Sequence, residues 1–153
     1  MRIVMLVSTA CLTAYGATAA AQQPTAAPKP ATQHAAAGIT LANIAGAWSI
    51  ESTVKTSAGK DTVVTSVLVA TPDGKSWVTH LAGRDPIATR VVAMGGDSVV
   101  TEAGPFPSVV RPGQTVTTQE TLHFKGNAIS GTIEARYSNG QVVKGAIKGT
   151  RKR

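Results

Sequence analysis

Cysteine is almost absent from this sequence, because Cys11 is the only one among 153 residues. A single cysteine cannot form an intrachain disulfide, so the fold must depend on its apolar core. Other reactive motifs are missing too: there is no Gly-x-Ser-x-Gly nucleophile elbow, no His-Glu-x-x-His zinc motif and no cysteine nucleophile. The sequence therefore predicts a protein that is not an enzyme.

Apolar runs long enough to span a membrane are also missing. A transmembrane helix needs about 20 apolar residues, whereas the uncharged stretch from Ile3 to Ala14 has about a dozen. Arg2 precedes this stretch, and two Ala-x-Ala patterns end at Ala19 and Ala21. This order predicts a cleavable signal peptide over residues 1–21. We expect cleavage near Ala19 to Ala21, a periplasmic or secreted location and no transmembrane segment afterwards.

Residues 22–38 contain little that could be buried in a core. Their sequence is QQPTAAPKPATQHAAAG, with three prolines within seven residues. Such a composition favours an extended, partly polyproline-like linker. The remaining residues, 39–153, have the length of one ordinary domain.

Helical periodicity is missing from residues 39–153, where no long segment repeats apolar residues at intervals of three and four. Short β-branched runs recur instead, separated by turn signals such as Pro72-Asp73-Gly74 and Ser138-Asn139-Gly140. An all-β fold follows, with an eight-stranded antiparallel up-and-down barrel favoured over a β-sandwich because closure removes exposed edges. The expected strands are Trp48–Lys55, Asp61–Thr71, Ser76–Leu81, Ile87–Met94, Ser98–Glu102, Gln114–Phe124, Ala128–Tyr137 and Gln141–Arg151.

Two short motifs stand at the ends of the expected barrel. Gly46-x-Trp48 opens the first strand, and Gly149-Thr150-Arg151 lies in the last. Together they resemble the calycin arrangement of lipocalins, fatty-acid-binding proteins and avidins. That resemblance implies barrel closure by Gly46, Trp48 and Arg151, with the tryptophan at the barrel floor and the arginine packed across it. Residues 96–106 also resemble uncharacterised exported bacterial proteins.

Aromatic residues are scarce: removal of the signal peptide with Tyr15 leaves five. Trp77, Phe106 and Tyr137 are the candidates for ligand binding, although each of them also suits a core position. Phe106 stands between Pro105 and Pro107, which should interrupt the strand pattern from Ala103 to Ser108. The phenylalanine then forms either a lip at the barrel mouth or a plug on the core.

Metal ligands show no spacing signature. His80 and His123 belong to separate expected strands, and a carboxylate such as Glu102 or Glu120 could in principle join them around zinc. Surface positions are the favoured interpretation of both histidines. We therefore expect no metal and no cofactor.

Acidic residues are few, and after signal removal 14 basic residues face 8 acidic ones, a net charge of +6. Five basic residues fall within the last ten, so the carboxyl terminus could contact anionic surfaces. An exported protein is not expected to bind nucleic acid. The leading functional hypothesis is a non-enzymatic barrel that binds a small apolar or amphipathic ligand at the end opposite Trp48. The alternative is a protein-interaction or protease-inhibitor module of the cell envelope, in which the linker or residues 104–107 contact the partner.

Overall fold

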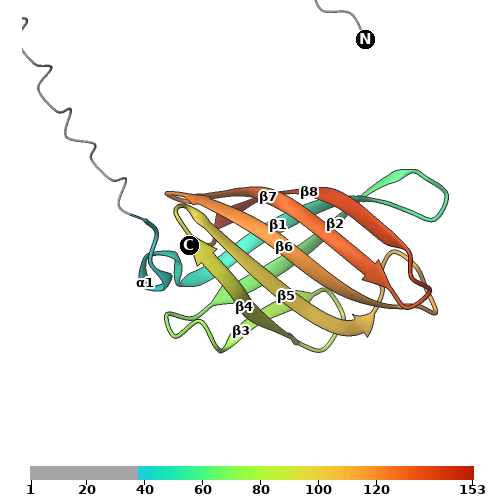
Figure 1. Ribbon diagram of the computed structural model, residues 1–153, viewed down its shortest axis with the longest axis horizontal. Coiled ribbons are helices and arrows are strands. Elements are labelled where there is room, and N and C mark those ends of the chain that lie inside the picture. The colour runs from blue at the N-terminus through green and yellow to red at the C-terminus, as the bar shows by residue number, and fades with distance from the viewer. Residues whose placement is uncertain (1–37) are drawn as a thin grey trace, which may run out of the picture. The chain divides into compact units, whose positions relative to one another are not determined.

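The computed structural model describes residues 38–153, which form a closed barrel of antiparallel strands in the order β1 to β8 (Figure 1). A short helix, α1 (Leu41–Ile44), lies beside the start of β1 (Figure 1). Among the described residues no helix is long and apolar enough to cross a membrane. The strands are β1 (Gly46–Lys55), β2 (Asp61–Ala70), β3 (Trp77–Leu81), β4 (Ile87–Gly95), β5 (Ser98–Pro107), β6 (Thr115–Lys125), β7 (Ala128–Tyr137) and β8 (Val142–Arg151).

The predicted all-β, up-and-down barrel is confirmed, and β8 pairs with β1 to close it. The alternating burial of β1 and β7 shows why these sequences form strands: inward positions recur at every second residue, and most of them are apolar. The predicted signal peptide and residues 22–37 of the predicted linker lie outside the described residues. Helix α1 was not predicted, because four residues are too few to show a helical period.

The expected interruption after Glu102 was wrong. Strand β5 continues to Pro107, and its register with β6 shifts between Ala103 and Phe106. Such a bulge leaves residues outside the hydrogen-bond ladder, so prolines without a backbone N–H can stand within the strand. The bulge places both Ala103 and Phe106 against the interior, although their positions differ by three, an odd number.

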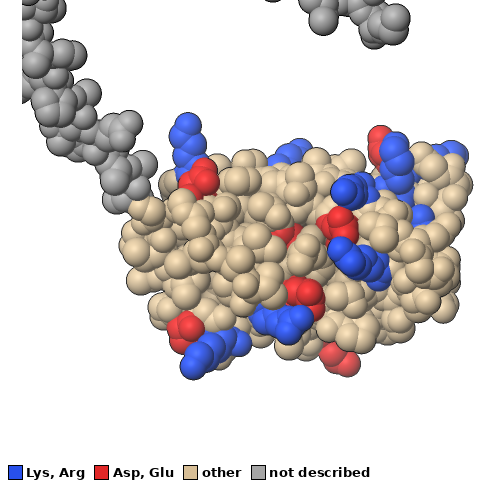
Figure 2. Space-filling model, viewed as in Figure 1, with Lys and Arg blue, Asp and Glu red and all other residues tan. Residues whose placement is uncertain are grey.

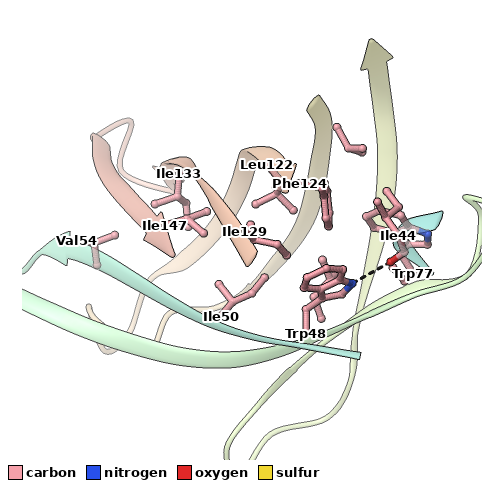
Figure 3. Close-up of a cluster of buried hydrophobic side chains, with 13 residues drawn as sticks. Ile44, Trp48, Ile50, Val54, Trp77, Leu122, Phe124, Ile129, Ile133 and Ile147 are labelled. Carbon is pink, nitrogen blue, oxygen red and sulfur yellow. Dashed lines mark hydrogen bonds between the residues drawn. The ribbon is translucent and has the colours of Figure 1, made fainter. Parts of the chain in front are cut away.

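The end of the barrel next to α1 is packed solid. Thr40 caps α1 by accepting a hydrogen bond from the backbone of Asn43, and Ile44 is buried beneath the helix. Trp48 is fully buried there, and its indole Nε1 donates to the carbonyl of Ile44 at 2.9 Å (Figure 3). Phe124 meets the Trp48 ring edge-on, with ring centroids 5.1 Å apart. The largest apolar cluster in the described chain surrounds these rings.

Inward-facing glycines allow the strongly curved part of the barrel wall to close. A Cβ atom at Gly131 of β7 would collide with the carbonyl oxygen of Thr121 on β6. On β8 a Cβ at Gly149 would lie 2.6 Å from the carbonyl oxygen of Ser49. Neighbouring strands approach so closely here that no larger residue fits.

Replacement of Gly131 by alanine is therefore expected to lower the free energy of unfolding by about 1–3 kcal/mol, the usual cost of overpacking. Equilibrium urea unfolding measures this change. Gly95→Ala is the matched control, since a Cβ at Gly95 meets nothing within 4 Å and should leave stability unchanged or slightly higher. Equal stabilities of the two variants would contradict the expectation.

The barrel wall is held together by the fewest register pairs around β3. This strand has five residues, and only three register pairs join it to β4. By contrast, β1 and β2 share ten register pairs. The weakest seam of the barrel therefore runs between β3 and β4.

Candidate functional site

The residues predicted to close the barrel meet at the packed end. The Arg151 guanidinium stacks 4.3 Å from the centre of the Trp48 ring. It also donates to the carbonyl oxygens of Ala45 and Asn43, at 2.6 and 2.7 Å. A Cβ atom at Gly46 would lie 2.9 Å from this guanidinium, so the glycine leaves the space that Arg151 occupies. These contacts fix the floor and leave any binding site to the other end.

Trp77, one of the three ligand-binding candidates, belongs to this packed end. Its side chain is 1% exposed and lies in the same apolar cluster as Trp48. The indole Nε1 donates to the carbonyl of Thr71 at 2.8 Å. Trp77 does not line the interior cavity described next, so its surroundings give it a core role.

The opposite half of the barrel encloses a cavity of about 70 Å³. Phe106 and Tyr137, the other two candidates, both line it. The aliphatic lining comes from several strands and one loop: Val54, Val64, Leu81, Val109, Val110, Val116 and Ile133, with Ala103 and Ala135.

Hydroxyl groups form a second part of the lining. A polar belt of serine and threonine crosses the interior between the packed end and the cavity. Thr79 and Thr89 share a hydrogen bond of 2.9 Å within it, whereas the buried hydroxyl of Thr101 has no partner in the described chain. The belt consists of Ser52, Ser66, Thr79, Thr89, Thr101 and Thr118, and four of these, Ser52, Ser66, Thr79 and Thr118, line the cavity.

One carboxylate stands among these neutral groups. Glu120 lies on β6 between the inward residues Thr118 and Leu122, and its residual accessible surface faces the cavity. Its register partners are Thr101 on β5 and Ile133 on β7. Burial away from water raises the pKa of this carboxyl from 4.5 to about 7, since desolvation penalises the charged form.

A loop of residues 108–114 covers the mouth of the barrel. The Ser108 hydroxyl accepts from the backbone N–H groups of Val110 and Arg111, and the Arg84 guanidinium donates to the Pro107 carbonyl at 2.8 Å. The Arg111 guanidinium stacks 4.3 Å from the centre of the Tyr137 ring and donates to Gln141. This loop is thus tethered at the mouth, where Val109 and Val110 line the cavity.

An external groove of about 920 Å³ runs along the barrel wall beside this loop. It lies between residues 83–88, which connect β3 to β4 and begin β4, and residues 104–107 of β5. Phe106 is the one residue that lines both the groove and the cavity. Phe106 therefore borders both spaces.

The two histidines and Glu102, considered as zinc ligands, lie on the outer surface. His80 is exposed on β3, and His123 lies 3.3 Å from Asp97. Glu102 faces outward and pairs with Arg90 at 2.5 Å, on the opposite side of the wall from Glu120. The described chain contains no group of three residues that could hold a metal ion.

Charged side chains are dispersed across the visible face of the barrel, mostly as single groups or opposite-charge pairs (Figure 2). Glu134, for instance, contacts Arg136 at 2.6 Å and Lys144 at 3.6 Å. Exposed pairs of this kind contribute little stability.

Sequence reasoning considered Glu120 only as a zinc ligand and missed its place in the interior. Alternation along β6 carried the signal: counting back from Phe124 and Leu122 by twos reaches Glu120.

Comparison of the chain with protein-family models, with curated proteins and with solved structures found no match.

Proposed function

We propose that this barrel is a binding protein that takes one small molecule into the cavity opposite the Trp48 floor. The observation that carries the proposal is the unequal filling of the two halves. Aromatic and aliphatic side chains fill the half next to α1, whereas the other half keeps an unfilled space edged by hydroxyl groups. Cores normally pack without such voids.

The lining favours an amphipathic ligand. Aliphatic side chains offer contact to a small carbon skeleton, and the polar belt together with Glu120 offers hydrogen-bond partners. One water-sized probe needs about 10–15 Å³, so the cavity has room for about five non-hydrogen atoms. The proposal includes no reaction, since the described lining holds no second carboxylate, histidine or cysteine beside Glu120.

The location and relationship of the protein are also proposals. The pattern of residues 1–21 supports export to the periplasm or the medium. The stacking of Arg151 on Trp48 supports a likeness to calycin barrels. In the alternative of an interaction module, residues 104–107 would contact a partner as part of β5, since they form no separate loop.

Filling the cavity should abolish binding. Ser66 points inward from β2, and Ser66→Leu places a larger apolar side chain in the space that a ligand would occupy. Isobutanol, with five non-hydrogen atoms, is a suitable probe. We expect it to shift the amide NMR signals of cavity strands in the wild type and to have no effect in Ser66→Leu.

Thr65→Leu is the matched control, because Thr65 is the exposed neighbour on the same strand. It should leave probe binding intact. Tryptophan fluorescence is a poor readout here, since Trp48 and Trp77 both lie in the packed half. Equal binding by wild type and Ser66→Leu would overturn the proposed function.

A further inference from the structure

Glu120 is an isolated negative charge inside the barrel. In the described chain its carboxylate has no hydrogen bond and no ion pair, although burial of an unpaired charge is costly. The neighbouring Thr101 hydroxyl, opposite Glu120 in register, is also without a partner. Two adjacent interior groups thus have unused hydrogen-bonding capacity.

No positive side chain of residues 38–153 lines the cavity beside this carboxylate. Every other residue that lines the cavity is uncharged, whichever strand or loop it comes from. Tyr137 is the only other titratable group in the lining. The nearest cation on the cover loop, Arg111, stacks on the Tyr137 ring and binds Gln141, and it is not a lining residue. When Glu120 is ionised, the described lining offers it no positive partner, and a cationic ligand would supply one.

An alkylammonium group meets these demands. It carries one positive charge and three donors, which match the Glu120 carboxylate and the surrounding hydroxyl groups. The aliphatic side chains of Val54, Val64 and Val116 provide contact for a short carbon chain. With Glu120 ionised, an anionic ligand would instead face repulsion, and a neutral one would leave the charge unpaired.

We propose that the cavity is specific for a small primary amine in its ammonium form, held by an ion pair with Glu120. This inference rests on the proposed function and names its ligand class. Charge-assisted hydrogen bonds are roughly twice as strong as neutral ones, so the pair would dominate the affinity of such a small ligand.

The pH dependence of binding has a definite direction. Because the pKa of Glu120 in the free protein is about 7, the carboxyl is protonated at pH 5 and ionised at pH 8, while the amine stays charged throughout. Affinity for the amine should therefore rise about 100-fold from pH 5 to pH 8, following the ionised fraction of Glu120.

The test compares isobutylamine with isobutanol, two probes with one carbon skeleton, by amide NMR titration of the protein at pH 8. Isobutylamine is expected to bind more tightly than isobutanol. Glu120→Gln should weaken isobutylamine binding by about 10- to 100-fold, the range of a hydrogen bond to a charged group, and leave isobutanol binding unchanged. Glu51→Gln is the charge-matched control, since Glu51 pairs with Lys148 on the outer surface and should alter neither probe.

The outcomes separate the two proposals. Binding of isobutanol with no preference for the amine, or with no effect of Glu120→Gln, would overturn the amine site and leave a neutral ligand pocket. Binding of neither probe would overturn both. Ammonium chloride that shifts the same signals as strongly as isobutylamine would mean that an inorganic cation suffices, which also overturns the amine class.

Discussion

Glu120→Gln is expected to raise the free energy of unfolding at pH 8 by about 3 kcal/mol, while leaving it nearly unchanged at pH 4.5. The glutamine amide has the shape of the protonated carboxyl and never ionises. The pKa of the carboxyl is about 7 in the folded protein against an ordinary value of 4.5. Each unit of such a difference corresponds to about 1.4 kcal/mol.

The sign follows from where the protons are bound. Between pH 4.5 and 7 the folded state holds a proton on Glu120 that the unfolded chain has already released. Stability of the wild type therefore falls as pH rises through this window and becomes level above it. Urea unfolding at pH 4.5, 6 and 8 measures this slope.

In Glu120→Gln the slope should disappear, and in Glu51→Gln, where the carboxylate is on the outer surface, it should persist. Parallel pH profiles for wild type and Glu120→Gln would show that the carboxylate is solvated. A residue that destabilises the fold at neutral pH and faces a cavity fits the trade-off between stability and binding. The variant expected to unfold less readily is also the one expected to lose the amine.

Trp48→Ala should cost about 3–5 kcal/mol of unfolding free energy, the range for removing a buried large aromatic side chain. Trp48 has no exposed surface and contacts both Phe124 and Arg151. The substitution also leaves the Ile44 carbonyl without its donor. Denaturant unfolding followed by far-ultraviolet circular dichroism measures the loss.

Arg151→Met provides the comparison. It keeps much of the packing and removes the charge over the ring, a contact that is favourable by about 0.5–2 kcal/mol. Its effect should be clearly smaller than that of Trp48→Ala. Trp48→Phe, which retains an aromatic ring, should lie between the two if the alanine variant proves too unstable to measure. A reversed order would mean that the cation rather than the indole holds the floor.

The strands were predictable because apolar alternation and tight turns repeat along residues 46–151. The sequence left a choice between a closed barrel and a β-sandwich, and eight expected strands favoured the barrel because they can close and remove exposed edges. Alternation shows which residues share a face, but it does not show which face is inside. The interior position of Glu120 therefore needed neighbours of known direction, such as Phe124 on the same strand.

The place of Phe106 within a strand was not predicted for another reason. A bulge adds one residue to a strand and reverses the alternation after it. Two prolines signalled an irregularity, and the sequence placed it at the end of a strand. The structure has it within β5, so Phe106 turns inward beside Tyr137. The cavity itself depends on how far side chains from all strands reach, which no local pattern records.

Local opening of the barrel is expected to begin at the short pairing between β3 and β4. Local opening starts where the fewest hydrogen bonds must break together, and only three register pairs hold these strands. The external groove that Phe106 shares with the interior begins at this same part of the wall. Opening at this pairing would loosen the part of the wall that the groove and Phe106 border, while the contacts of the Trp48 floor stay in place.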